Sequence, residues 1–242
     1  HMLNYNHEQA IACFTATTEL DPNCAMAWWG IAYCVSSNYN WSPGLGSGHD
    51  PIQQALKVMD HCTELEQDLI RALSTRHSAE ARDAADPTVL NMGNDPALNV
   101  AFAEAMAPLY EKYAGNLDVT AIYVEALMNL KAWQLWDKNT ATGEITPADD
   151  NTLLLVKIME EAFDSSDEAK VHPALCHLYC TPSNSRPSRK RPFLPPMSCE
   201  PACRDLAISS TCPPTSTLGS VSGRKPLNAT SPPLRPTTAT WN

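Results

Sequence analysis

The stretch Leu20–Tyr33, LDPNCAMAWWGIAY, restricts the possible folds more than any other part of the chain. It sets Trp28, Trp29 and Gly30 among alanines, shortly after an Asp-Pro pair of the kind that ends a helix. Two helices approach closely only where one presents Ala or Gly and the other inserts a ring. The stretch therefore predicts two antiparallel helices that meet at the Asp-Pro pair, with aromatic rings seated against small side chains.

The residues before this junction predict a first helix that stops there. Ala10, Phe14 and Thr17 are spaced four and three apart, which places them in one stripe on a helix. Together with the stretch above, they resemble the junction between two tetratricopeptide repeats (TPRs), although Ala32 and Val35 stand where that signature has glycine and tyrosine. An ordinary helical bundle remains the alternative, because no period of about 34 residues is evident further along the chain.

Helical periodicity continues along the chain to residue 180. The apolar positions predict helices over residues 51–62, 64–77, 97–113, 118–136, 149–163 and 172–180. The breaks between them carry turn residues, as in LWDKNTATGEITPADD, and no segment shows the alternation of a strand. The predicted fold class is all-α, with antiparallel helical hairpins stacked as a TPR-like α-solenoid and an irregular C-terminal tail.

The longest apolar segment, LDVTAIYVEALMNLKAWQLWD, is interpreted as one helix that sends Ile122, Leu127, Trp133 and Trp136 into the core. Four segments, NHEQAIACF, DPNCAMAWWGIAY, YVEALMNLKAWQLWD and HPALCHLY, look like a group of bacterial and fungal TPR-like proteins of largely unassigned function. This resemblance covers residues 1–180. It implies an all-helical solenoid and no established chemistry.

The composition changes at Thr181. Residues 1–180 hold 25 acidic and 9 basic side chains, a balance of −16, whereas residues 181–242 hold 2 acidic and 8 basic ones, a balance of +6. The second segment also holds 12 of the 20 prolines and has no helical period. We therefore predict two regions, a TPR-like helical domain over 1–180 and a basic Pro/Ser/Thr-rich tail over 181–242 that is disordered.

A one-base frameshift is a second interpretation of the tail. Regrouping the codons from Thr181 onward permits strings that continue the same helical family, including H-L-V-H-M-P-S-H-I-D across residues 208–217. A solenoid needs a terminal unit with a polar outer face, and the tail does not supply one. We therefore expect residues 172–180 to form a frayed or poorly packed last helix.

Histidines are the main candidate bases and metal ligands apart from the acids; they are His7, His49, His61, His77, His172 and His177. No Ser-His-Asp order or nucleophile elbow is recognisable, so no catalytic residue is assigned. His172, Cys176 and Cys180 are four apart and would lie along one face of a helix. The alternative function is therefore a metal-binding protein or metal-dependent enzyme, with His7, His172, Cys176 and His177 as candidate ligands and the site completed by a missing native C-terminus.

The chain as written does not supply four well-placed ligands, and we expect it to bind no metal or other cofactor. Its nine cysteines form an odd number and fall mostly within helical patterns, which favours reduced, mostly buried thiols. No stretch is apolar enough for a membrane span, and no basic start precedes an apolar run. A cytoplasmic protein without a membrane partner is expected, and the opening His1-Met2 fits a native chain and a cloning remnant equally.

The favoured function is non-enzymatic binding of a protein or peptide. Stacked helical hairpins form a concave groove that accepts a peptide or a partner helix. Repeats that grip a peptide's terminal carboxylate use Lys and Asn on the first helix, and this chain has Trp29 and Tyr33 there. With few basic residues in the helical region, nucleic acid and acidic ligands are poor partners. A basic or apolar segment fits better.

Overall fold

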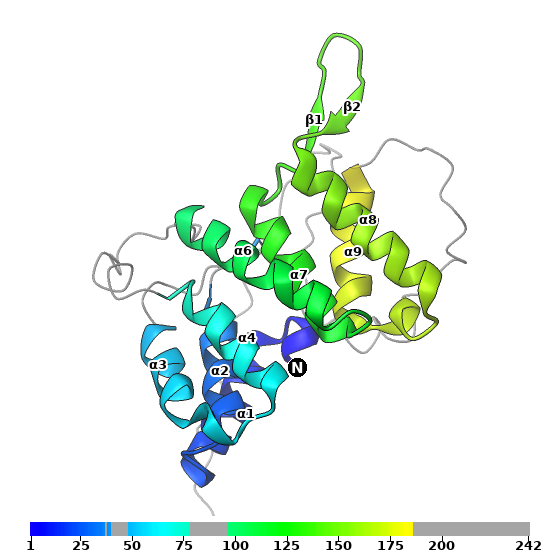
Figure 1. The fold of residues 1–242 in the computed structure, drawn as a ribbon. Helices are drawn as coiled ribbons and strands as arrows, with labels where there is room; N and C mark the ends of the chain where they lie inside the picture. The colour runs from blue at the N-terminus through cyan, green and yellow to red at the C-terminus, as the bar shows by residue number, and fades with distance from the viewer. Residues whose placement is uncertain (37, 40–47, 78–95, 186–242) are drawn as a thin grey trace, which may run out of the picture. The chain divides into compact units, whose positions relative to one another are not determined.

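The computed structural model describes residues 1–36, 38–39, 48–77 and 96–185, and these are mostly helical (Figure 1). All of them belong to one compact unit, His1–Lys190. The α-helices are α1 (His7–Leu20), α2 (Ala25–Cys34), α3 (His49–Val58), α4 (Glu64–Ser74), α6 (Pro96–Lys112), α7 (Leu117–Met128), α8 (Asp150–Ser165) and α9 (Pro173–Ser185). Short 3₁₀ turns lie at η1 (Met2–Asn4), η2 (Met59–His61), η3 (Asn129–Lys131) and η4 (Ala169–Val171).

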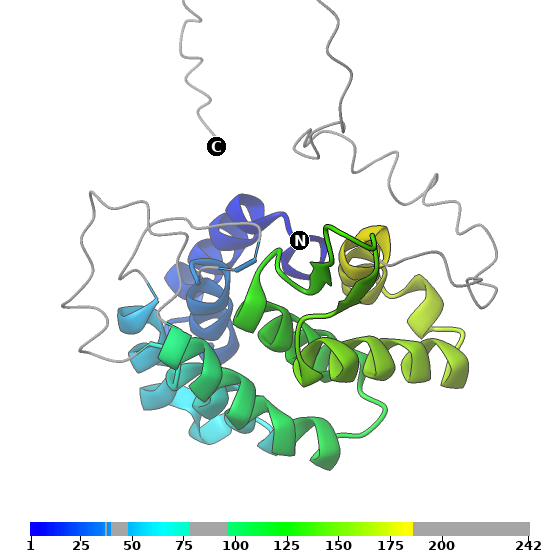
Figure 2. The same ribbon diagram turned by 90° about the horizontal axis from the view of Figure 1, so that it is seen from above.

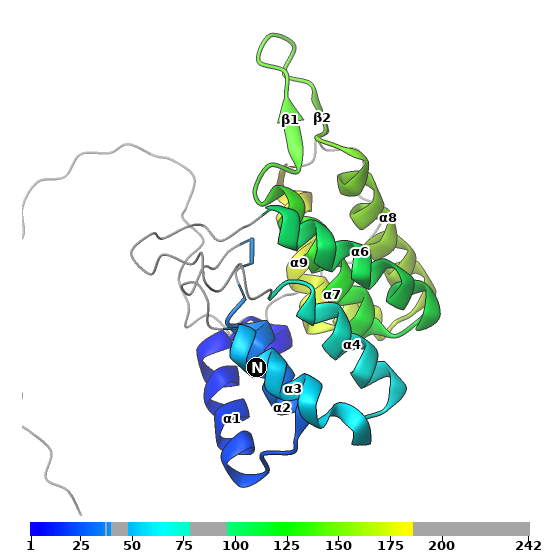
Figure 3. The ribbon, with the colours of Figure 1, turned by 60° about the vertical axis from the view of Figure 1, so that its left-hand side comes forward.

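Each helix packs on the next one along the chain. The contacting pairs are α1 with α2, α2 with α3, α3 with α4, α4 with α6, α6 with α7, α7 with α8, and α8 with α9. Contacts also join α2 to α4 and α7 to α9, one helix further on. The succession from α1 to α8 can be followed in Figure 3. The prediction of a mostly helical chain with consecutive packing is confirmed.

One long-range contact departs from this order. The 3₁₀ turn η1, near the start of the chain, packs against α9, the last described helix. Figure 2 shows the two side by side. In an open solenoid each repeat contacts only its neighbours. This contact brings the two ends of the described chain together and, as shown below, builds the most polar part of the interior.

Side-chain caps explain where several helices begin. Thr63 and Glu66 form a capping box at α4, in which Glu66 accepts a hydrogen bond of 2.8 Å from the Thr63 amide. Asn116 caps α7 by accepting from the Val119 amide at 3.1 Å, and Asp149 caps α8 in the same way. Each cap satisfies amides that have no partner within the helix. These caps are local features of the sequence, and the helices predicted from the apolar period begin close to them.

The predicted packing at the α1–α2 junction is present, with a different ring in the close contact. A Cβ added at Gly30 would lie only 2.7 Å from Cδ2 of Phe14, so the Phe14 ring of α1 lies directly on the Gly30 backbone. Trp29 is buried, and its Nε1 donates to the Leu69 carbonyl of α4 at 3.1 Å. Trp28 is half-buried and donates to the Pro22 carbonyl at 2.9 Å. The ring against the glycine is therefore Phe14, and Trp29 is the deeper tryptophan.

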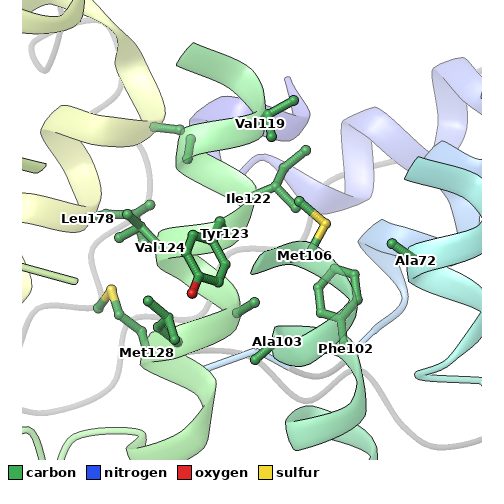
Figure 4. Packing of buried hydrophobic residues seen from close by; sticks show 14 of the residues in the cluster. Ala72, Phe102, Ala103, Met106, Val119, Ile122, Tyr123, Val124, Met128 and Leu178 are labelled. Atoms are coloured by element: carbon green, nitrogen blue, oxygen red, sulfur yellow. The ribbon is translucent and has the colours of Figure 1, made fainter. Parts of the chain in front are cut away.

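Helix α7 is the centre of the core. Its residues from Val119 to Met128 are all buried, as expected for a helix covered on every side. Figure 4 shows Val124 and Met128 of α7 near Leu178 of α9, with Phe102 of α6 across from them. Burying side chains of this size contributes about 1.5–3 kcal/mol each. Within the buried stretch from Val119 to Met128, Glu125 is the only carboxylic acid.

The prediction that α7 continues to residue 136 is wrong. Asn99 of α6 donates to the backbone carbonyl of Asn129 at 3.2 Å, at the position where the α-helix gives way to a 3₁₀ turn. The helix ends at Met128, and Trp133 has a left-handed backbone (φ 61°) and a side chain that is 63% exposed. Leu135 is buried instead. Trp136 is only half-buried.

The expectation of no strands is also wrong. Strands β1 (Trp136–Lys138) and β2 (Ile145–Pro147) pair antiparallel, with Asp137 opposite Thr146. Asn139 shapes the connecting turn, because its side-chain oxygen accepts from the amides of Ala141 and Thr142 at 2.9 and 3.1 Å. The run interpreted as a loop is therefore a short hairpin.

The expectation of a frayed last helix is wrong as well. Ala174, Leu175 and Leu178 of α9 are at most 2% exposed, and α9 extends to residue 185. The ring of Tyr179 meets Phe163 of α8 edge-on, with centroids 5.2 Å apart. The predictions for the remainder of the tail, including disorder and the frameshift, fall outside the described residues. Over the described residues, no helix has the length and apolarity needed to cross a membrane.

Candidate functional site

The four candidate metal ligands lie in two different places. His172 precedes α9 and caps it, because its Nδ1 accepts from the Leu175 amide at 3.3 Å while its Nε2–H donates to Asp118 at 3.1 Å. This hydrogen bond holds the pKa of Asp118 below its usual value. The thiol of Cys176 donates to the Lys170 carbonyl at 3.2 Å. His172 thus lies outside the helix on whose face it was predicted.

His7 and His177 lie together in the second place, on either side of Tyr5. The Tyr5 ring stacks on His177 with centroids 4.2 Å apart and meets His7 edge-on at 5.7 Å. Asn38 donates to Nε2 of His7 at 3.3 Å, so the His7 proton is on Nδ1, which is buried and has no hydrogen-bond partner. Burial lowers the pKa of both histidines. Both rings are therefore neutral at pH 7.

Across the described ranges, no group of three or more His, Cys, Asp or Glu side chains is placed to hold a metal ion. None of the six cysteines within these ranges forms a disulfide bond, in agreement with the prediction of reduced cysteines. The prediction that they are mostly buried is wrong, since only Cys34 is buried while Cys13 and Cys180 are exposed. Burial raises the pKa of Cys34 to about 12, so this thiol is unreactive.

The polar centre of the structure is Glu125, on the buried face of α7. Its Oε2 accepts two hydrogen bonds from tyrosine hydroxyls, one from Tyr33 of α2 at 2.8 Å and one from Tyr5 at 3.0 Å. Tyr33 in turn stacks on Trp29 with ring centroids 5.2 Å apart. One carboxylate oxygen thus joins three segments that lie 92 and 120 positions apart in the sequence.

Arg76 is the cation of this centre. It is buried, its guanidinium lies over the Phe102 ring at 5.6 Å, and its Nε donates to Asn99 at 3.1 Å. The side-chain amide of Asn99 in turn donates to the Asn129 carbonyl. The positive charge of Arg76 favours the ionised form of Glu125. Buried charges persist only where partners compensate their lost hydration.

Burial is the largest influence on the titration of this centre. It raises the pKa of Glu125, while the Tyr33 hydrogen bond and the charge of Arg76 act in the opposite direction. Burial beside a carboxylate raises the pKa of Tyr5 and of Tyr33 far above that of a free phenol. The two phenols therefore stay protonated and donate hydrogen bonds over the whole physiological pH range.

A small pocket opens beside Glu125. It is bounded on one side by Met2, Leu3 and Tyr5 and on the other by α2, α7 and α9, through Tyr33, Ala121, Ile122, Glu125 and Ala174. Its volume is about 10 Å³, the lower limit for one water molecule. No substrate fits while Met2–Tyr5 lies in place. The helices here present an aliphatic floor and one buried acceptor.

At a second histidine, His77, no acid from the described residues is hydrogen-bonded to the ring, so no catalytic triad is seen there. Ser36 donates its hydroxyl proton to the Ala32 carbonyl at 2.8 Å, and Nε2–H of His77 donates to the same hydroxyl at 2.8 Å. The serine proton is therefore directed away from the imidazole. Burial lowers the pKa of His77 to about 4, which makes it a neutral structural donor.

The cluster around Glu125 was not predicted from the sequence. The run VTAIYVEALM contained the signal, because a single carboxylic acid in an otherwise apolar stretch needs partners once it is buried. Its partners Tyr5, Tyr33 and Arg76 come from three other segments, and no local pattern links them. Comparison with known proteins adds no assignment, since no protein family, curated protein or solved structure matches this chain.

Proposed function

We propose that this chain is a TPR-like binding protein that holds a peptide segment of a protein partner against α2, α7 and α9. One observation supports the proposal: these helices already hold such a segment, Met2–Tyr5, which is distant from them in sequence except for α2. The segment is held by side-chain contacts, with its aliphatic residues on Ala121 and Ile122 and its tyrosine on Glu125. The solenoid arrangement of the helices and the existence of a protein partner are both part of what we propose.

The surface beneath the segment has the composition of a peptide groove. We name it the α7 groove and define it by Tyr33, Ala121, Ile122, Glu125, Ala174 and His177. Apolar side chains there supply contact area, and one buried polar group supplies orientation, as in most ligand sites. The polar groups of the groove are a carboxylate and a neutral imidazole ring. A carboxylate repels an acidic ligand, so an apolar segment fits this groove better.

Selection from a random peptide library on the full-length protein tests the proposal. We expect selected peptides to bind in solution and to shift the NMR methyl signals of Ala121, Ile122 and Ala174. Ile122→Glu, which puts a charge on the floor of the groove, should abolish binding. Glu104→Gln, on the exposed side of α6, is the matched control and should leave binding unchanged. Failure to select any peptide, or shifts confined to other helices, would contradict the proposal.

A further inference from the structure

The segment that covers the α7 groove has an unfavourable backbone conformation at the residue that reaches Glu125. Tyr5 has φ 59° and ψ 20°, the left-handed conformation that a residue with a Cβ avoids. Asn4, directly before it, is exposed, and Met2 and Leu3 are only half-buried. The contacts of the Tyr5 side chain are therefore made against the preference of its own backbone, while Met2 and Leu3 add partly buried apolar contacts with the core.

The surroundings of Tyr5 select a phenol. Its hydroxyl donates to Glu125 at 3.0 Å, and its ring is stacked on His177 with planes 24° apart. Tyr39 meets the opposite part of the ring at a centroid distance of 6.4 Å. A phenylalanine would keep both ring contacts and lose the hydrogen bond. Because Glu125 is buried, an acceptor left without that donor is costly.

The same surroundings exclude a phosphorylated tyrosine. A phosphate at the hydroxyl position would lie beside the Glu125 carboxylate, which repels it. The cation of this centre, Arg76, donates to Asn99 at 3.1 Å, and no contact between Arg76 and Tyr5 is seen among the described residues. Leu3, two residues before Tyr5, meets the aliphatic wall of the groove. The groove thus distinguishes two features, namely a free phenol and an aliphatic residue two positions earlier.

We propose that the partner segment carries an unphosphorylated tyrosine with an aliphatic residue two positions before it, and that it displaces Met2–Tyr5 from the α7 groove. This inference rests on the proposed function and names its ligand. In the covered state the pocket has room for about one water, so the two segments compete for a single site. Release of the strained Tyr5 backbone favours the exchange.

The test uses the acetylated hexapeptide HMLNYN, which copies residues 1–6, and the full-length Tyr5→Gly variant. Glycine adopts the left-handed conformation freely, so this variant loses the ring and keeps the turn. We expect the peptide to bind Tyr5→Gly at least tenfold more tightly than the unaltered protein, measured by calorimetry. Replacing the peptide tyrosine by phenylalanine should weaken binding about tenfold, or about 1.4 kcal/mol, and by phosphotyrosine should abolish it.

A second variant removes the acceptor in the same background. Adding Glu125→Ala to Tyr5→Gly should reduce the difference between the tyrosine and phenylalanine peptides to less than about twofold, provided that the thermal melt shows a folded protein. If that variant does not fold, Tyr5→Phe replaces it: its weaker cover should bind the tyrosine peptide more tightly than the unaltered protein does. Equal binding of the tyrosine and phenylalanine peptides to Tyr5→Gly would overturn the inference.

The library selection separates this inference from the function on which it depends. Peptides that bind the α7 groove without enrichment of tyrosine would overturn the ligand assignment and leave peptide binding standing. Free p-cresol serves as the small-molecule control. If it binds Tyr5→Gly as tightly as the hexapeptide does, the groove recognises a phenol alone, and the assignment to a peptide segment is overturned.

Discussion

Tyr33 of α2 donates its hydroxyl to Glu125 of α7 at 2.8 Å, across 92 positions of sequence and within the buried core. The hydrogen bond connects the first helical hairpin to the central helix, and Tyr5 makes the second bond to the same oxygen. Two donors on one carboxylate oxygen fix the direction of that side chain. The interior of this protein is therefore organised by a polar contact as well as by apolar packing.

Glu125→Ala should lower the free energy of unfolding by about 3–5 kcal/mol, because it leaves two hydroxyls without their acceptor and the buried Arg76 without a compensating negative charge. Urea denaturation followed by circular dichroism measures the change. Glu104→Ala removes an exposed acid of α6 and should change stability by less than about 0.5 kcal/mol. A loss below about 1 kcal/mol for Glu125→Ala would show that the cluster contributes little.

Gly30→Ala should destabilise the protein by about 1–3 kcal/mol, although alanine favours a helix by about 1 kcal/mol over glycine. The added methyl group would collide with the Phe14 ring. Phe14→Ala in the same chain removes the collision, so the double variant should be more stable than the sum of the single changes by about 1 kcal/mol or more. Strict additivity in the denaturation midpoints would argue against the contact.

The two tryptophans Trp29 and Trp133 should respond very differently to truncation. Trp29→Ala removes a buried ring and its hydrogen bond to Leu69, and should cost about 3–5 kcal/mol. Trp133→Ala removes a mostly exposed ring and should cost less than about 1 kcal/mol.

Trp133→Gly adds a backbone test at the same position. Since φ at Trp133 is 61°, glycine should make the protein more stable than alanine there by about 1 kcal/mol. Thermal melting of the three tryptophan variants checks both statements. A glycine variant less stable than the alanine variant would mean that this backbone is not left-handed in solution.

Acidification should destabilise the fold through His77. Burial lowers its pKa from 6.5 to about 4, and the charges of Arg76 and His49 act in the same direction. Between these two pH values the unfolded state binds a proton that the folded state does not, so the free energy of unfolding falls as pH falls through this window. The loss reaches about 3 kcal/mol at pH 4.

Other groups contribute to the same pH range, so the variant His77→Gln supplies the comparison. His7 and His177, with lowered pKa values, act in the same direction as His77, whereas Glu125, with a raised pKa, loses stability as pH rises. Glutamine retains an amide donor for Ser36 and does not titrate. Unfolding free energies measured from pH 7 to pH 4 should fall less steeply for the variant, and parallel curves would contradict the assignment.

The sequence by itself determined where the helices lie. The periods of apolar residues and the caps at Thr63, Asn116 and Asp149 are local signals, and local interactions decide where a helix begins. The junction at Asp21-Pro22 was evident for the same reason, because a glycine among large rings signals close packing wherever the partner ring comes from. The mostly helical character of the chain and the order of its helices therefore followed from short-range information.

Only the tertiary structure decided which residues of different helices contact one another. Asn99 of α6 donates to the Asn129 carbonyl just after the end of α7, Trp133 is exposed with a left-handed backbone, and a short hairpin follows. Tyr5, Tyr33 and Arg76 gather around Glu125 because a buried charge requires compensation from any segment that can reach it. Such partners are selected by distance in the folded chain, and no periodicity in the sequence records that distance.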